Sequence, residues 1–222
     1  MTTLAMPRPR RDSGMEGMVA KWYAANTAEI MNQYVELVQR IAGEIPPGSA
    51  VLEVAPGPGY FSIDLAKRGN YSITGLDLSH TFVEMGAKCA AEAGVHVSFV
   101  QGSASNMPLQ ANSFDFLLCR AAFKNFGQPV AALREMYRVL KPGGRALIID
   151  LRGDASAGEI SRQVDDMGLT TVNRFLTKLA FRHFLLRRAY TKQQFEQMLA
   201  QTAFSRTNVT ESGVGLGIWM TK

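Results

Sequence analysis

The chain has 222 residues, 46% of them hydrophobic and 19% charged, so it can bury a sizeable core and is not disordered as a whole. Its net charge of +5 is diffuse, which disfavours a nucleic-acid-binding protein. The two cysteines lie far apart and no run approaches about 18 apolar residues, so we expect no disulfide framework, no metal site and no membrane span. The N-terminus lacks the apolar segment of a secretory signal, which favours a cytoplasmic location.

The N-terminal part of the chain predicts helices. Residues 1–14, rich in arginine and proline, are expected to form a disordered leader. From Met15 to Ile41, apolar residues recur at helical spacing, which predicts one or two amphipathic helices that end before the segment GEIPPGS. We assign residues 15–47 to this helical region.

Strand-like runs and helical patterns then alternate with short connections. Strands are predicted over 50–55, 71–79, 96–104, 113–121 and 145–151. Helices are predicted over 60–69, 80–94 and 129–140, and the segment KPGG after the last of them predicts a turn. The alternation predicts an α/β fold with a parallel sheet and helices on both faces, which we assign to residues 48–151.

The pattern changes after this core. Residues 152–190 show no obvious strand and contain a basic, aromatic-rich helical stretch, so we assign them to a cap insertion. Thr191 is a plausible N-cap for a further helix, and two strand-like runs, RTNVTES and LGIWMTK, end the chain. Residues 191–222 are therefore expected to form a helix and an antiparallel ribbon at the edge of the sheet.

The stretch VLEVAPGPGY, residues 51–60, is an apolar run that enters a loop of small residues. Gly57 and Gly59 let the backbone approach a ligand closely and adopt positive φ. Asp77, at the end of the next predicted strand, suits a carboxylate that accepts hydrogen bonds from ribose hydroxyls, although it could instead cap the following helix. The prolines at 56 and 58 remove two amide donors, so the loop favours a nucleoside with an amino-acid tail over a pyrophosphate.

Four stretches in order, VLEVAPGPGYFSIDLAKRG, ITGLDLS, VQGSASNMPLQANSFDFLLCRAAFKNF and ALREMYRVLKPGGRALIIDL, resemble class I S-adenosylmethionine-dependent methyltransferases. The nearest type is the small-molecule branch that includes the ubiquinone and menaquinone biosynthesis methyltransferases. The resemblance covers about residues 48–151. It implies a Rossmann-like, mostly parallel seven-stranded sheet with an antiparallel C-terminal edge strand. It also implies S-adenosyl-L-methionine as cofactor, S-adenosyl-L-homocysteine as its product and a small-molecule acceptor.

The resemblance implies roles for residues at the matching positions. Glu53 would lie near the methionine ammonium of the cofactor, and Asp77 would hold the ribose hydroxyls. The loop beneath the methionine part would be formed by Ala55, Gly57 and Gly59.

By the same resemblance, adenine would contact residues after the second and third strands, namely Leu78, Gly102, Ser103 and Ala104. Residues after the fourth strand would line the sulfonium end, namely Cys119, Arg120 and Ala121, with Phe123 close behind. The helices of 15–47 would fold over the cofactor as a lid, from which Tyr23 reaches the cofactor carboxylate. Alternatively, Trp22 packs on the sheet and Tyr23 is partly exposed.

The sequence departs from the family pattern at three places. Ala55 replaces the first glycine of the loop, so its backbone must take a conformation that an L-residue tolerates. Ser103 stands near the position where the family often has an acid for the adenine amino group. The segment Lys124-Asn125-Phe126 replaces a common histidine pair, so no histidine base is available there.

The sequence gives the least information about the substrate that would accept the methyl group. Candidate substrate contacts are His183, Arg187, Phe123 and Lys124, and no catalytic base is assigned. The basic stretch 174–190 has three readings: a cap helix over the acceptor, an amphipathic helix in weak contact with an anionic membrane surface, or a solvated face.

The leading hypothesis is methyl transfer by in-line displacement to an O, N, S or C nucleophile of a small, aromatic or heteroatom-bearing acceptor, through positioning and desolvation. Two alternatives are a non-catalytic S-adenosylmethionine-binding protein and a quinone-type lipid methyltransferase at a membrane surface. We expect a monomer or a homodimer.

Overall fold

The computed structural model describes residues 12, 14–27, 31–165 and 186–222. Within them, seven strands form one sheet in the order β3-β2-β1-β4-β5-β7-β6. The strands are β1 (Ala50–Val54), β2 (Ser72–Asp77), β3 (Ser98–Gln101), β4 (Phe114–Arg120), β5 (Leu140–Leu151), β6 (Arg206–Ser212) and β7 (Gly215–Thr221). The first five are parallel, and β7 runs antiparallel between β5 and β6. The predicted seven-stranded Rossmann-like sheet is therefore confirmed.

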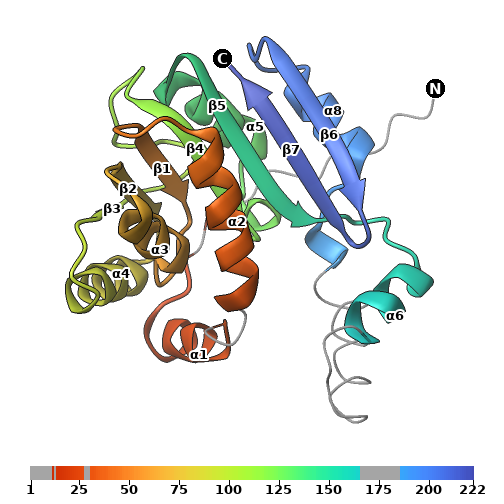
Figure 1. Ribbon diagram of the computed structural model, residues 1–222. Coiled ribbons are helices and arrows are strands. Elements are labelled where there is room, and N and C mark those ends of the chain that lie inside the picture. The colour runs from red at the N-terminus through yellow and green to blue at the C-terminus, as the bar shows by residue number, and fades with distance from the viewer. Residues whose placement is uncertain (1–11, 13, 28–30, 166–185) are drawn as a thin grey trace.

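Helices cover both faces of this sheet (Figure 1). One face carries α2 (Met31–Glu44), α3 (Tyr60–Arg68) and α4 (His80–Glu92), and the other carries α5 (Pro129–Val139) and α8 (Lys192–Leu199). Two further helices, α1 (Gly17–Thr27) and α6 (Ala157–Asp165), lie beyond the carboxyl ends of the parallel strands. Short 3-10 turns are formed by η2 (Phe123–Asn125) and η4 (Leu186–Arg188).

The strands alternate their side chains between the two layers. In β4, Phe116 and Leu118 pack in the cluster beneath α2 and α3, while Leu117 and Cys119 pack in the cluster beneath α5. All four side chains are fully buried. This alternation follows from the twofold period of a strand, and it explains why the run reads as continuously apolar in a strand covered on both faces.

The turn predicted at KPGG is corrected by the structure, which includes these residues in β5. Leu140 pairs with Phe114, and Arg145 pairs with Phe116, so the four residues between them bulge out of the ladder. Gly143 accommodates the bulge with a φ of 78°. Because the buried Leu140 already pairs with β4, the strand begins before the glycines rather than after them.

The other predicted elements agree with the structure within a few residues. The N-terminal pattern forms two helices, and α2 continues to Glu44, past its predicted end. Thr191 caps α8: its Oγ1 accepts from the Gln194 N–H at 3.2 Å, and Gln194 Oε1 accepts from the Thr191 N–H at 2.9 Å. Across the ranges that the structure describes, no helix has the length and apolarity needed to cross a membrane.

Candidate functional site

The candidate site lies at one edge of the sheet. Because β1 to β4 are parallel, the loops that follow their carboxyl ends meet at the same edge. Val54 pairs with both Leu76 and Cys119, so the chain leaves β1 between the ends of β2 and β4. The strand order therefore brings residues 55–59, 77–79, 102–105 and 121–127 together.

The loop after β1 depends on left-handed backbone. Ala55, Gly57 and Gly59 have φ values of 58°, 56° and 80°. A Cβ at Gly59 would lie 2.6 Å from the Phe99 ring, whereas a Cβ at Gly57 would meet no atom within 4 Å. Gly59 is therefore required for packing as well as conformation, while Gly57 borders open space in which a ligand can approach the backbone.

Ala55, which replaces the first glycine of the loop, adopts the left-handed backbone conformation although it carries a Cβ. Its N–H donates to Leu76 O at 2.8 Å, which holds the strained conformation in place. A non-glycine residue in this region costs about 1–2 kcal/mol. We expect Ala55→Gly to raise the free energy of unfolding by about 0.5–1 kcal/mol, because added chain entropy in the unfolded state offsets part of the relief.

Urea denaturation checks this prediction. Ala66→Gly, in the interior of α3, is the matched control and should lower the free energy of unfolding by about 1 kcal/mol. Equal destabilisation by both substitutions would contradict strain at Ala55.

Asp77 ties two loops of the site together. Its Oδ2 accepts from the Gly57 N–H at 3.1 Å, and its Oδ1 accepts from the Ser79 N–H at 2.9 Å. The N-cap of α4 is Ser79, whose Oγ accepts from the Phe82 N–H at 3.1 Å. The carboxylate therefore braces the glycine loop instead of serving as the N-cap. Within the described part of the chain, each oxygen accepts one of these hydrogen bonds and has a further acceptor position for a ligand. Burial raises the pKa of Asp77, against the lowering effect of these N–H donors.

Glu53, the last acid of β1 before the loop, is 4% exposed. One oxygen accepts from the backbone N–H of Ser62 at 3.1 Å and from the Ser62 hydroxyl. Burial raises the pKa of Glu53 from 4.5 to about 7, although the Ser62 hydrogen bonds oppose the shift. A carboxyl that titrates near neutral pH under the glycine loop would be stabilised in its charged form by a cationic group of a ligand. Sequence analysis did not predict Ser62 as the partner of Glu53.

The residues predicted to contact adenine gather after β2 and β3. The Gly102 N–H donates to Asp77 O at 2.9 Å, which joins the two strand ends. A Cβ at Gly102 would lie 2.6 Å from the Pro108 ring, so glycine is required there for packing. Leu78 is half-buried, and Ala104 is 9% exposed. These positions are compatible with the predicted contacts, which stay predictions.

An N-terminal segment crosses this part of the site, and sequence reasoning missed it. Asp12 Oδ2 accepts from the Ser103 hydroxyl at 2.6 Å. Glu16 Oε1 accepts from the His80 N–H at 3.0 Å, and Glu16 Oε2 accepts from the Thr81 N–H at 3.1 Å, at the start of α4. Both acids come from the end of the predicted leader or just after it. No local pattern could have assigned them partners more than 60 residues away.

Cys119 lies within β4 and not after it, and in the loop that follows β4, Ala121 and Asn125 are exposed. Cys119 and Phe123 have no exposed surface, and Phe123 packs against Tyr190 and Phe195 with ring centroids 5.9 and 4.9 Å apart. Burial also raises the pKa of the Cys119 thiol well above its usual range. Contact of these two side chains with a ligand stays a prediction, and it would require a rearrangement of the packing seen here.

Lys124 has a structural partner in this state. Its ammonium donates to Asp150 Oδ1 at 2.8 Å and to Ala121 O at 2.6 Å, while its backbone N–H donates to Asp150 Oδ2 at 2.9 Å. Ala121 itself has a φ of 57°. The ion pair is almost fully buried and holds the loop after β4 against the end of β5. A substrate contact by Lys124 stays a prediction.

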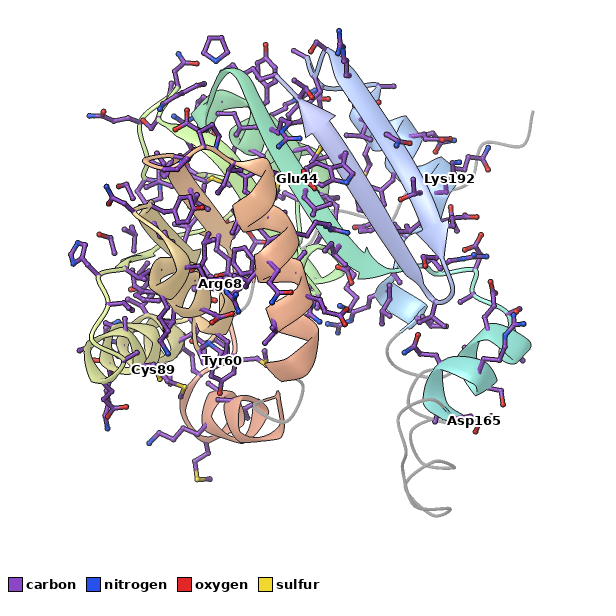
Figure 2. The ribbon with its side chains drawn as sticks, viewed as in Figure 1. Glu44, Tyr60, Arg68, Cys89, Asp165 and Lys192 are labelled. Carbon is purple, nitrogen blue, oxygen red and sulfur yellow. The ribbon has the colours of Figure 1, made fainter. Side chains whose placement is uncertain are left out.

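Three predicted residues cannot be placed at the site. His183 lies outside the described residues, and the side chains of Tyr23 and Arg187 do as well. The backbone of α1 nevertheless reaches the site, because the Tyr60 hydroxyl at the start of α3 donates to Ala24 O at 3.2 Å (Figure 2). The helix that carries Tyr23 is therefore attached next to the glycine loop.

Comparison with known proteins places this geometry in context. Residues 52–148 match a family model described as a methyltransferase domain. The demethylmenaquinone methyltransferase of Listeria monocytogenes serotype 4a is 37% identical over 109 residues, which are 48% of this chain and 46% of that protein. The chain thus spans about half the length of this curated relative.

Two solved structures share the fold. A proposed S-adenosyl-L-methionine-dependent methyltransferase of Methanococcus maripaludis has a TM-score of 0.77 at 22% identity and covers 98% of this chain and 97% of its own. The plantazolicin methyltransferase BamL, in complex with S-adenosylhomocysteine and a triazolic desmethylPZN analog, has a TM-score of 0.66 at 16% identity, covering 91% and 88%. At these identities the likeness establishes the fold.

Proposed function

We propose that this chain, whose residues 52–148 form a methyltransferase domain of the class I S-adenosylmethionine-dependent type, transfers a methyl group to a small-molecule acceptor. The observation that supports the proposal best is the joining of the glycine loop to the acid of the next strand, where the Gly57 N–H donates to Asp77. This arrangement leaves a carboxylate with free acceptor capacity beside backbone that borders open space.

The residues present fit S-adenosylmethionine. Asp77 would accept hydrogen bonds from the ribose hydroxyls, and Gly57 and Gly59 would lie beneath the methionine part. Glu53 would balance the positive charge of the methionine ammonium, since its carboxyl already titrates near neutral pH. The prolines at 56 and 58 provide no amide donors for a pyrophosphate, which agrees with a ligand that has none.

The bound cofactor would supply a methyl group that its sulfonium already activates. The contribution of this chain is then to position the two reactants and to keep water away from them. Both Asp77 and Glu53 are less than 10% exposed, so each would act on a ligand in a poorly hydrated environment, where charge interactions are stronger than in water.

A quinone-type acceptor is a second, narrower candidate. It is favoured by the similarity to demethylmenaquinone methyltransferases, which covers only about half of each chain. The basic stretch 174–190, which would carry His183 and Arg187 toward such an acceptor or rest on a membrane, lies mostly outside the described residues. Membrane contact is an alternative role for this stretch, and liposome co-sedimentation distinguishes it from contact with the acceptor.

Titration calorimetry with S-adenosylhomocysteine tests the proposed cofactor site. We expect saturable binding of one ligand per chain, and absence of binding would contradict the proposal. Methyl transfer from radiolabelled S-adenosylmethionine to a panel of phenols, amines, thiols and reduced naphthoquinones then separates an enzyme from a non-catalytic binding protein. Binding without transfer to any acceptor would favour the non-catalytic alternative.

A further inference from the structure

Residues 12 and 14–17 lie against the part of the site where the cofactor base would lie. The carbonyl of Met15 accepts from the Ser79 hydroxyl, directly after β2. Glu16 holds the start of α4 through His80 and Thr81. A Cβ at Gly14 would lie 3.2 Å from Ser79 Cα, so the segment sits in close contact with the end of β2.

Asp12 reaches farthest across this edge. Its Oδ2 accepts from the hydroxyls of Ser103 and Ser105, at 2.6 and 3.3 Å, after β3. Its Oδ1 accepts from the Gly127 N–H at 2.6 Å, in the loop that follows β4. The Ser103 hydroxyl and the Gly127 N–H thus orient one carboxylate that comes from outside the sheet. The Ser105 hydroxyl shares its one proton between this carboxylate and Gln128 O, each at 3.3 Å.

This carboxylate lies against the loop that follows β3, and β3 is the strand that pairs with the end of β2 at Asp77. Adjacent strands are about 4.8 Å apart, so a nucleoside whose ribose is held by Asp77 is long enough to reach the loop after β3. If its base lies on that side, its amino group comes near the Asp12 carboxylate. The residues after β3 are Gly102, Ser103 and Ala104, and none of them carries a charged acceptor. Among the described residues, Asp12 Oδ1 accepts one hydrogen bond, which leaves this oxygen with a second acceptor position for a ligand.

We propose that Asp12 completes the base-binding part of the site by accepting a hydrogen bond from the adenine amino group, and so determines specificity for adenine. This inference rests on the proposed function, because it requires an adenosyl ligand at the edge of β2. Ser103, Ser105 and Gly127 act as positioning residues. They hold the carboxylate, and the second acceptor position of Oδ1 is the one proposed to meet the adenine amino group.

The test compares two ligands in each variant by calorimetry. One is S-adenosylhomocysteine, and the other is its purine-riboside analogue, in which hydrogen replaces only the amino group. We expect the unsubstituted protein to prefer the adenine ligand by about ten- to hundredfold, as is typical of one hydrogen bond to a charged group. Asp12→Ala should weaken binding of the adenine ligand and reduce this preference to about threefold or less, while affinity for the analogue changes little.

Glu16→Gln is the matched control, because it loosens the same segment at α4 without touching the proposed amino contact. It should weaken both ligands alike and retain the preference. An unchanged preference in Asp12→Ala would overturn the inference, and tighter binding of S-adenosylhomocysteine by that variant would instead show that the segment obstructs the site. If the unsubstituted protein binds neither ligand, the proposed function fails as well, so the two failures are distinguishable.

Discussion

Replacing Asp77 by alanine is expected to weaken the binding of S-adenosylhomocysteine at least a hundredfold. The substitution removes a carboxylate that would accept two hydrogen bonds from ribose hydroxyls, each worth about 1.5–3 kcal/mol when the acceptor is charged. It also removes the acceptor of the Gly57 and Ser79 N–H groups, which brace the glycine loop. Titration calorimetry measures the change in affinity.

Asp77→Asn is a milder substitution, because it keeps one of the two oxygen acceptors that brace the loop. Asparagine keeps one oxygen acceptor but loses the charge, so we expect about a tenfold loss of affinity with the fold retained. Asp115→Asn is the matched control, because Asp115 forms an ion pair with Lys141 at the opposite edge of the sheet, at 2.7 Å. It should leave affinity unchanged. Normal binding by Asp77→Ala would refute the ribose assignment.

Glu53→Gln is expected to stabilise the ligand-free protein at pH 8 by about 2–3 kcal/mol. The folded-state pKa of Glu53 is about 7, against 4.5 as the reference value. Below pH 4.5 the carboxyl is protonated in both states, so it imposes no penalty. Between pH 4.5 and 7 the unfolded chain releases its proton first, so stability falls as pH rises, and above pH 7 the full penalty remains.

Urea midpoints at pH 5, 6, 7 and 8 check this expectation. The difference between Glu53→Gln and the unsubstituted protein should be small at pH 5 and should grow up to pH 8. Glu36→Gln, at an exposed position of α2, should show no such growth. A difference that stays constant across this range would contradict an ionisation of Glu53 near pH 7. The same Glu53→Gln variant is expected to bind S-adenosylhomocysteine more weakly, because it lacks the charge for the ligand ammonium.

Much of the fold was predictable because its signals are local. Apolar runs predicted β1 to β5, although the start of β5 was placed too late. Thr191 predicted the start of α8 through a capping box whose partner is three residues away. The prediction of a turn at KPGG was wrong, because the start of β5 depends on a pairing between residues that are distant in sequence. Leu140 belongs to β5 because it pairs with Phe114 on a strand that the preceding helix separates from it in sequence.

Some features of the candidate site were also predictable from local sequence, and others were not. Gly57, Gly59 and Asp77 were predicted as site residues, because loop glycines and an acid at a strand end can be recognised from residue type and spacing. The sequence did not predict the burial that raises the pKa of Glu53 or the ion pair between Lys124 and Asp150. Each depends on neighbours that only the tertiary packing brings close.

By itself, then, the sequence determined the order of strands and helices, the glycine loop and the family resemblance, since these depend on residue types at short spacing. The tertiary structure alone decided which distant groups meet at the site. Asp12 and Gly127 are 115 residues apart, yet they hydrogen bond because parallel strands end at one edge and the N-terminal segment is held across it. Such contacts depend on chain topology, and a short sequence window contains no information about which distant donor a carboxylate will meet.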